Sequence, residues 1–185
     1  MTNKHLTLPT LLTWFRIGLV PVFIGIYYMP DLLVPMFYKN LFAALIFAIA
    51  AVTDYLDGYL ARKLKQESNF GAFLDPVADK ALVASSLVML VFLQRTFVFA
   101  AIVIILREIT ISALREWMAK LGNNQSIAVA YIGKLKTAFQ MLAIGLLLFD
   151  YHTRVIGNLC MIVAVVLTIM SMFYYLEQAK KYFNS

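Results

Sequence analysis

Apolar residues along this chain gather in six long blocks that short polar segments separate. Most blocks approach roughly 20 residues, the length of an α-helix that crosses the hydrocarbon core of a bilayer. Strands of a membrane barrel would instead show short segments of alternating polarity. The pattern therefore predicts an all-α integral membrane protein with six transmembrane helices, at residues 11–29, 41–60, 73–93, 97–114, 135–149 and 155–175.

The composition supports one membrane-embedded domain. Of the 185 residues, 62% are hydrophobic and 14% are charged, and neither half of the chain is soluble in character. A mixture of this kind lies outside the range of ordinary soluble domains. We expect a single catalytic domain over residues 1–185, in which residues 1–10 form an interfacial N-terminal segment that is retained.

The positive charges predict the orientation of the helices. If the N-terminus is cytoplasmic, three of the 16 Lys and Arg residues fall on the outer side, namely Lys39, Arg95 and Arg154. The other 13 then lie inside, which agrees with the excess of positive charge on cytoplasmic loops. Both termini are expected in the cytoplasm. Because the basic residues border apolar blocks, the formal charge of +6 does not indicate a nucleic-acid partner.

Four aspartates stand within one 26-residue stretch that is otherwise mostly apolar: Asp54, Asp57, Asp75 and Asp79. Carboxylates in such segments are costly, and they indicate a functional site by default. On helices, the first pair shares one face and the second pair forms a stripe with Gly71. The short segment 63–70 would make the two helices antiparallel neighbours. Four facing carboxylates would repel one another unless cations lay between them.

Oxygen ligands without a nearby His or Cys favour Mg²⁺ or Mn²⁺. Two such ions can grip a pyrophosphate, and a carboxylate can accept a proton from an attacking hydroxyl. The Asp75-Pro76 pair is compatible with the first turn of a helix. Two other interpretations stay open from spacing alone: an ion or proton path in a small transporter, and structural pairing of the acids with Lys80 and Arg62.

The eight spaced residues of the string D-x-x-D-G-x-x-A-R…G-x-x-x-D-x-x-x-D resemble the signature of the CDP-alcohol phosphotransferases. The resemblance implies a six-helix membrane enzyme, usually a homodimer, in which an alcohol displaces CMP from a CDP-linked donor. It implies that two divalent cations, Mg²⁺ or Mn²⁺, bind the four aspartates and that Asp79 also serves as general base. It also implies that the donor is bound by Asp57, Gly58, Ala61, Arg62 and Gly71.

Two later strings suggest the acceptor. Arg107 and Arg115 lie eight residues apart near one helix face, and Lys134 and Lys136 lie at the start of the fifth block. Together they predict a cationic pocket for a soluble phosphate. Snorkelling of basic side chains at the inner leaflet is the alternative.

Both strings resemble the bacterial phosphatidylglycerophosphate synthase branch of the family. This likeness implies transfer of a phosphatidyl group from CDP-diacylglycerol to sn-glycerol 3-phosphate, with release of CMP, at the inner face of the bacterial cytoplasmic membrane. The opening residues 8–16 also resemble the entry segment of the family. Thr13 and Arg16 match that segment, and Thr13 is expected at the donor; Thr10 stands where the family has Asn.

Other functions compete with this interpretation. A sibling enzyme would use serine, inositol phosphate or phosphatidylglycerol as the acceptor. An intramembrane prenyltransferase would be expected to carry a second Asp-rich motif late in the chain, and none follows Asp79. A small transporter predicts solute flux without release of CMP.

Overall fold

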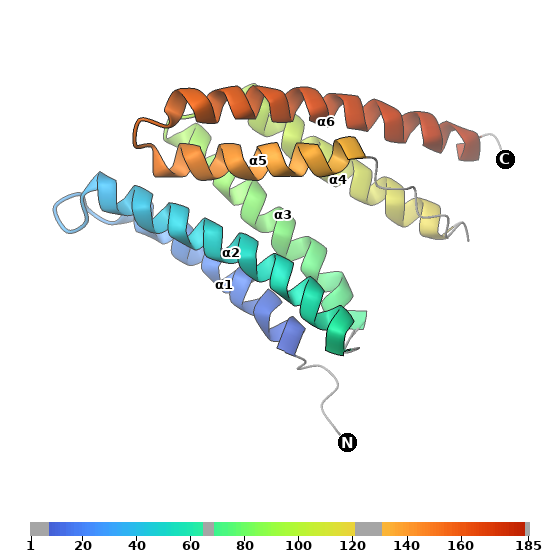
Figure 1. Ribbon diagram of the computed structural model, residues 1–185, viewed down its shortest axis with the longest axis horizontal. Coiled ribbons are helices and arrows are strands. Elements are labelled where there is room, and N and C mark those ends of the chain that lie inside the picture. The colour runs from blue at the N-terminus through green and yellow to red at the C-terminus, as the bar shows by residue number, and fades with distance from the viewer. Residues whose placement is uncertain (1–7, 65–68, 121–130, 184–185) are drawn as a thin grey trace, which may run out of the picture. The chain divides into compact units, whose positions relative to one another are not determined.

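The computed structural model describes residues 8–64, 69–120 and 131–183. Within these ranges the side chains at 8–9, 55–64, 69–70, 72, 115, 119–120, 131–132 and 178–183 are outside the description. The described ranges hold six α-helices and no strand (Figure 1). The helices are α1 (Leu8–Tyr28), α2 (Met36–Leu64), α3 (Asn69–Phe92), α4 (Val98–Lys120), α5 (Tyr131–Phe149) and α6 (Arg154–Phe183).

Each predicted apolar block corresponds to one helix, so the all-α prediction is confirmed. Within the described residues, three helices are long and apolar enough to cross a membrane, over Thr10–Tyr28, Met36–Asp54 and Arg154–Glu177. Helices extend beyond their blocks at several ends, most clearly in α2 and α6. Backbone hydrogen bonds do not require apolar side chains, so a helix can continue into a polar flank. Six spans remain a prediction.

Pro76 lies deeper in its helix than the sequence suggested. Because α3 begins at Asn69, Pro76 is inside the helix and not in its first turn. A proline there removes one backbone N–H from the helical ladder and disturbs the turn that precedes it. Asp75, immediately before it, therefore lies at a weakened point of α3.

The chain divides into two compact units, and each is described by itself. The first comprises Met1–Met89 with Leu148–Asp150, and the second comprises Leu90–Leu147 with Tyr151–Ser185. Helix α3 belongs to the first unit except for its last residues. The expectation of a single domain stays a prediction.

In the first unit, α1 and α2 form an antiparallel hairpin (Figure 1). Phe23 of α1 and Phe47 of α2 are buried, with the small residues Ala43 and Ala50 beside them in the core. Small side chains allow helices in a membrane to approach closely. The ammonium of Lys39 closes the turn, because it donates to the Met29 carbonyl at 2.5 Å and lies 2.6 Å from Asp31.

In the second unit, α4 packs against α6, and the small residues Ala100 and Ala101 of α4 and Ala164 of α6 are buried. Gly157 in the first turn of α6 lies against the end of α5. A Cβ atom at Gly157 would stand only 2.8 Å from the Leu147 side chain, so the close approach requires glycine.

The tight turns of the second unit depend on basic side chains and on left-handed backbone. Gln94 has a φ of 54°, and Arg95 N–H donates to the Leu90 carbonyl at 2.9 Å, which closes the end of α3. The Arg95 guanidinium is buried and donates to the Leu147 carbonyl at 3.3 Å. Arg154 donates to the Gln94 carbonyl. Helix ends that lack intrahelical partners are satisfied in this way.

Candidate active site

A buried arginine joins the two halves of the acidic motif in the first unit. Arg16 is the only charged residue of α1, and its side chain is fully buried. Its Nη1 lies 2.5 Å from Oδ1 of Asp54 in α2 and 3.4 Å from Oδ1 of Asp75 in α3. The two carboxylates therefore converge on one nitrogen from different helices. Both remain partly open to solvent, with exposed fractions of 40% and 45%.

Two threonines of α1 lie on the same helix face as Arg16. Thr10, Thr13 and Arg16 recur every three residues and are all buried, so they share one face of the helix. Thr53, directly before Asp54, is also buried, and its hydroxyl donates back to the Ile49 carbonyl at 2.7 Å. In the largely apolar α1, this buried face is the polar one.

The remaining members of the motif are placed unequally. Asp79 lies one turn after Asp75 in α3 and is partly buried, and Gly71 lies one turn before it. Asp57, Gly58, Ala61 and Arg62 belong to the last turns of α2, where side chains are outside the described part of the chain. The structure thus brings Asp54 and Asp75 together, and the roles given to all these residues stay predictions.

The donor set suits a hard divalent cation. Asp54 and Asp75 supply carboxylate oxygens that already converge on one positive group, which is the arrangement that a bridging cation requires. Among the residues searched, which leave out Asp57, no three His, Cys, Asp or Glu side chains gather closely enough to hold a metal ion. Asp54 and Asp75 therefore fit the expected metal as part of a larger set.

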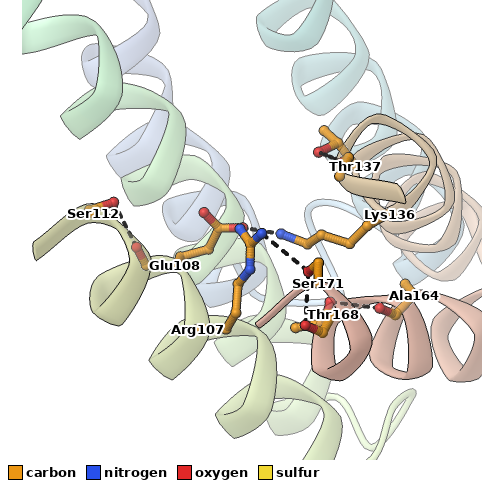
Figure 2. A network of polar contacts seen from close by, with 9 residues as sticks. Arg107, Glu108, Ser112, Lys136, Thr137, Ala164, Thr168 and Ser171 are labelled. Carbon is orange, nitrogen blue, oxygen red and sulfur yellow. Dashed lines mark hydrogen bonds and ion pairs between the residues drawn. The ribbon is translucent and has the colours of Figure 1, made fainter. Parts of the chain in front are cut away.

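A second polar cluster lies within the second unit (Figure 2). The Lys136 ammonium of α5 binds Oε1 of Glu108 in α4, and Nη1 of Arg107 lies 3.5 Å from the same oxygen. The Lys136 side chain is 2% exposed and that of Arg107 is 9% exposed, whereas Glu108 is 26% exposed. Two cations from different helices therefore meet at one carboxylate that solvent can reach.

Helix α6 holds the arginine of this cluster in place. Nη2 of Arg107 donates to the Ser171 hydroxyl at 3.2 Å, and the guanidinium carbon lies 5.6 Å from the centre of the Tyr175 ring. The Ser171 hydroxyl in turn donates to the Thr168 carbonyl at 2.9 Å. A guanidinium held by a hydroxyl, an aromatic face and a carboxylate has little freedom to rotate.

The other two cations predicted for the acceptor lie differently. Lys134 is exposed on α5, two residues before the buried Lys136. Residues two apart do not share a helix face. Arg115 belongs to α4, but its side chain is outside the described part of the chain. The structure thus brings Arg107 and Lys136 together and leaves Lys134 on another side of α5.

Sequence reasoning assigned no role to several residues of these clusters. Arg16 had been matched only to a family segment, although a lone charge in an apolar helix is itself a signal that it has a partner. Glu108 was assigned no role. Ser171 and Tyr175 gave no signal, because hydroxyl and aromatic residues are common in membrane helices.

Comparison with known proteins identifies the family. A family profile described as CDP-alcohol phosphatidyltransferase matches residues 6–170. The chain belongs to the CDP-alcohol phosphatidyltransferase family. The acidic motif on α2 and α3 resembles the signature of this family. Arg16 of α1 lies beside two residues of that motif, Asp54 and Asp75.

Curated relatives of this family member carry one name. A protein of Haemophilus influenzae is 50% identical over 177 residues, which cover 94% of this chain and 93% of the relative. Proteins of Pectobacterium atrosepticum and Sodalis glossinidius are each 49% identical, over 94% and 95% of this chain and 94% and 96% of their own lengths. All three are named CDP-diacylglycerol–glycerol-3-phosphate 3-phosphatidyltransferase.

Proposed function

We propose that this membrane protein transfers the phosphatidyl group of CDP-diacylglycerol to sn-glycerol 3-phosphate, giving phosphatidylglycerophosphate and CMP. The observation that carries the proposal is the convergence of Asp54 and Asp75, one from each half of the family motif, on Arg16. The names of relatives about half identical over nearly the whole chain support this pair of substrates.

The acidic motif acts on the donor. Asp54, Asp57, Asp75 and Asp79 would hold two divalent cations, Mg²⁺ or Mn²⁺, which would supply positive charge to the pyrophosphate. Small residues leave room beside the helix backbone for the cytidine part of the donor: Gly58 and Gly71 have no side chain, and Ala61 has only a methyl group. Arg62 binds the nucleotide end, and Thr13 contributes a hydroxyl from the buried face of α1. The acyl chains stay in the bilayer.

Asp79 accepts the proton of the reaction. The 1-hydroxyl of glycerol 3-phosphate loses its proton to the Asp79 carboxylate as its oxygen forms a bond to the phosphorus that carries diacylglycerol. The bond between that phosphorus and the CMP oxygen breaks, and CMP leaves with the electron pair. Asp79 is suited to this role because it lies on the same stripe of α3 as Asp75, one turn further on.

The basic cluster of the second unit binds the acceptor phosphate. Arg107 and Lys136 are buried and meet at the partly exposed Glu108, and a guanidinium next to an ammonium suits a phosphate dianion. Arg115 and Lys134 complete the predicted set from α4 and α5. The soluble acceptor reaches these residues from water, because Glu108 beside them is partly exposed.

The enzyme spans the bacterial cytoplasmic membrane six times, with both termini and the active site on the cytoplasmic side. Agreement between all six helices and the apolar blocks supports this topology. The three cations on the outer side are exceptions to the excess of positive charge inside, and the structure gives a reason for them. Lys39, Arg95 and Arg154 all donate to carbonyl oxygens at or near helix ends, so a structural role accounts for their position. Family resemblance supports a homodimer.

An assay of CMP release tests the function. The purified protein is given CDP-diacylglycerol in detergent together with one soluble alcohol at a time: glycerol 3-phosphate, serine, inositol phosphate or none. We expect release of CMP with glycerol 3-phosphate and little with the others. A preference for another acceptor would assign the protein to a sibling activity. Absence of CMP with every acceptor would reject the enzyme.

A further inference from the structure

Glu108 occupies an unusual position for a carboxylate beside a phosphate-binding pair. Its Oε1 is shared by the Lys136 ammonium and the Arg107 guanidinium, which come from two helices (Figure 2). Its backbone carbonyl accepts a hydrogen bond from Ser112 at 2.7 Å. Neither cation has much solvent around it, because both side chains are at least nine-tenths buried. The carboxylate therefore supplies negative charge that offsets part of the charge of two buried cations.

An anion that binds Arg107 and Lys136 has to share or replace this carboxylate. The Lys136 ammonium donates to Oε1 of Glu108, and Nη1 of Arg107 lies 3.5 Å from the same oxygen, so a phosphate oxygen bound between the two cations would compete with Oε1 for this position. The negative charge of Glu108 also opposes a second anion a few ångströms away. Glu108 thus has two opposite effects: it holds the cations in position, and it weakens their affinity for a phosphate.

We infer that Glu108 is a positioning residue that sets the affinity for the acceptor phosphate by competing for Arg107 and Lys136. The inference rests on the proposed function, in which these cations bind glycerol 3-phosphate. It goes beyond that function because it assigns a role to a residue that carries the wrong charge for phosphate binding. Moderate affinity has a kinetic use, since the phosphate of the product must leave the same cations.

Glu108→Gln separates the two effects. The amide has nearly the same shape and keeps an oxygen that can accept from Lys136, but it loses the negative charge. Glu177→Gln is the matched control, because Glu177 is an exposed carboxylate near the end of α6 and the substitution removes the same charge. The wild-type protein and both variants are compared as full chains in detergent.

The first measurement is steady-state CMP release. We expect Glu108→Gln to lower the KM for glycerol 3-phosphate by about three- to tenfold, the size of effect of one charge near a partly exposed site. The KM for CDP-diacylglycerol should not change, and Glu177→Gln should resemble the wild type in both. A KM for glycerol 3-phosphate that stays the same or rises in Glu108→Gln would overturn the inference.

The second measurement does not depend on activity. Inorganic phosphate is titrated while the melting temperature of each protein is followed. Glu108→Gln should be stabilised at a severalfold lower phosphate concentration than the wild type and Glu177→Gln. Equal responses, or no response in any of them, would overturn the inference. If the wild type released no CMP with glycerol 3-phosphate, the proposed function would fail while this titration still decided the role of Glu108.

Glu108→Asp covers the case in which the glutamine variant does not fold. It keeps the charge but draws it back by one methylene group, so contact with one cation is weakened. We expect a smaller decrease in the KM for glycerol 3-phosphate than in Glu108→Gln. A wild-type or higher KM for glycerol 3-phosphate in a folded Glu108→Asp would again contradict the competition.

Discussion

The guanidinium of Arg16 in α1 lies 2.5 Å from the carboxylate of Asp54 in α2, although 38 residues separate them in the chain. This pair places the only charge of α1 at the start of the family motif. A buried guanidinium without a counter-charge would cost several kcal/mol. The ion pair therefore explains why the apolar helix α1 contains an arginine. It also directs the polar face of α1 toward Asp54 and Asp75.

Substitution of Arg16 should impair both folding and turnover. Arg16→Gln leaves Asp54 and Asp75 facing each other without the shared cation. Because the acids are 40% and 45% exposed, the loss of stability should be smaller than the roughly 3–5 kcal/mol of a fully buried pair. We expect a lower melting temperature in detergent and about tenfold slower release of CMP, since catalytic carboxylates must be positioned accurately.

Arg16→Lys is the companion variant for this prediction. It keeps the charge but loses the planar fork that reaches two carboxylates, so its properties should be intermediate. If Arg16→Gln had wild-type stability and activity, the ion pair between Arg16 and Asp54 would contribute to neither.

Asp79→Asn should stop proton transfer without loss of donor binding. An amide cannot accept the hydroxyl proton, and general-base catalysis contributes about 10²- to 10⁴-fold. We expect CMP release to fall by about that factor, while binding of CDP-diacylglycerol, followed by protection against heat, stays within about twofold of the wild type. Parallel loss of donor binding would mean that Asp79 acts mainly by holding the metal and not as the general base.

The two lysines of α5 should differ in their effects. Lys136 is buried and bound to Glu108, whereas Lys134 is exposed two residues away. Lys136→Gln should raise the KM for glycerol 3-phosphate by about tenfold or more, because a charge-assisted contact to phosphate is lost. Lys134→Gln should raise it less, since an exposed cation is screened by water and salt. Equal effects would place the acceptor outside the buried cluster.

Removal of divalent cations should abolish activity. Incubation with a chelator should stop release of CMP. Without metal ions, Asp54 and Asp75 have only the charge of Arg16 between them, which is too little to bind a pyrophosphate as well. Addition of Mg²⁺ or Mn²⁺ in excess of the chelator should restore the activity. Ca²⁺ serves as the comparison, since its larger size and flexible coordination fit a compact oxygen site poorly. Undiminished turnover after chelation would reject the metal-dependent mechanism.

Gln94→Gly should stabilise the protein without a change in activity. Gln94 has a φ of 54°, and a left-handed conformation costs a residue other than glycine roughly 1–2 kcal/mol. The backbone carbonyl that accepts from Arg154 remains in the variant. We expect the melting temperature in detergent to rise by a few degrees, partly offset by the greater freedom of glycine in the unfolded chain. A lower melting temperature would mean that the Gln94 side chain stabilises the turn.

The sequence predicted the elements better than their contacts. The apolar blocks located all six helices, and only the ends were missed, because helical hydrogen bonding continues past the last apolar residue. Pro76 shows the same limit, since the start of α3 lay seven residues before it. The acidic motif and the basic strings were visible in advance because their spacing is local.

By itself, the sequence determined the helical class, the acidic motif and the carboxylate chemistry on which the metal prediction rests. Only the tertiary structure decided which cation meets which acid. Arg16 lies 59 residues from Asp75, and Lys136 lies 28 residues from Glu108. Helical periodicity relates residues within three or four positions, whereas pairs at these separations depend on how whole helices pack. For that reason the shared carboxylate of Glu108, which has the wrong charge for a phosphate site, became meaningful only in the folded chain.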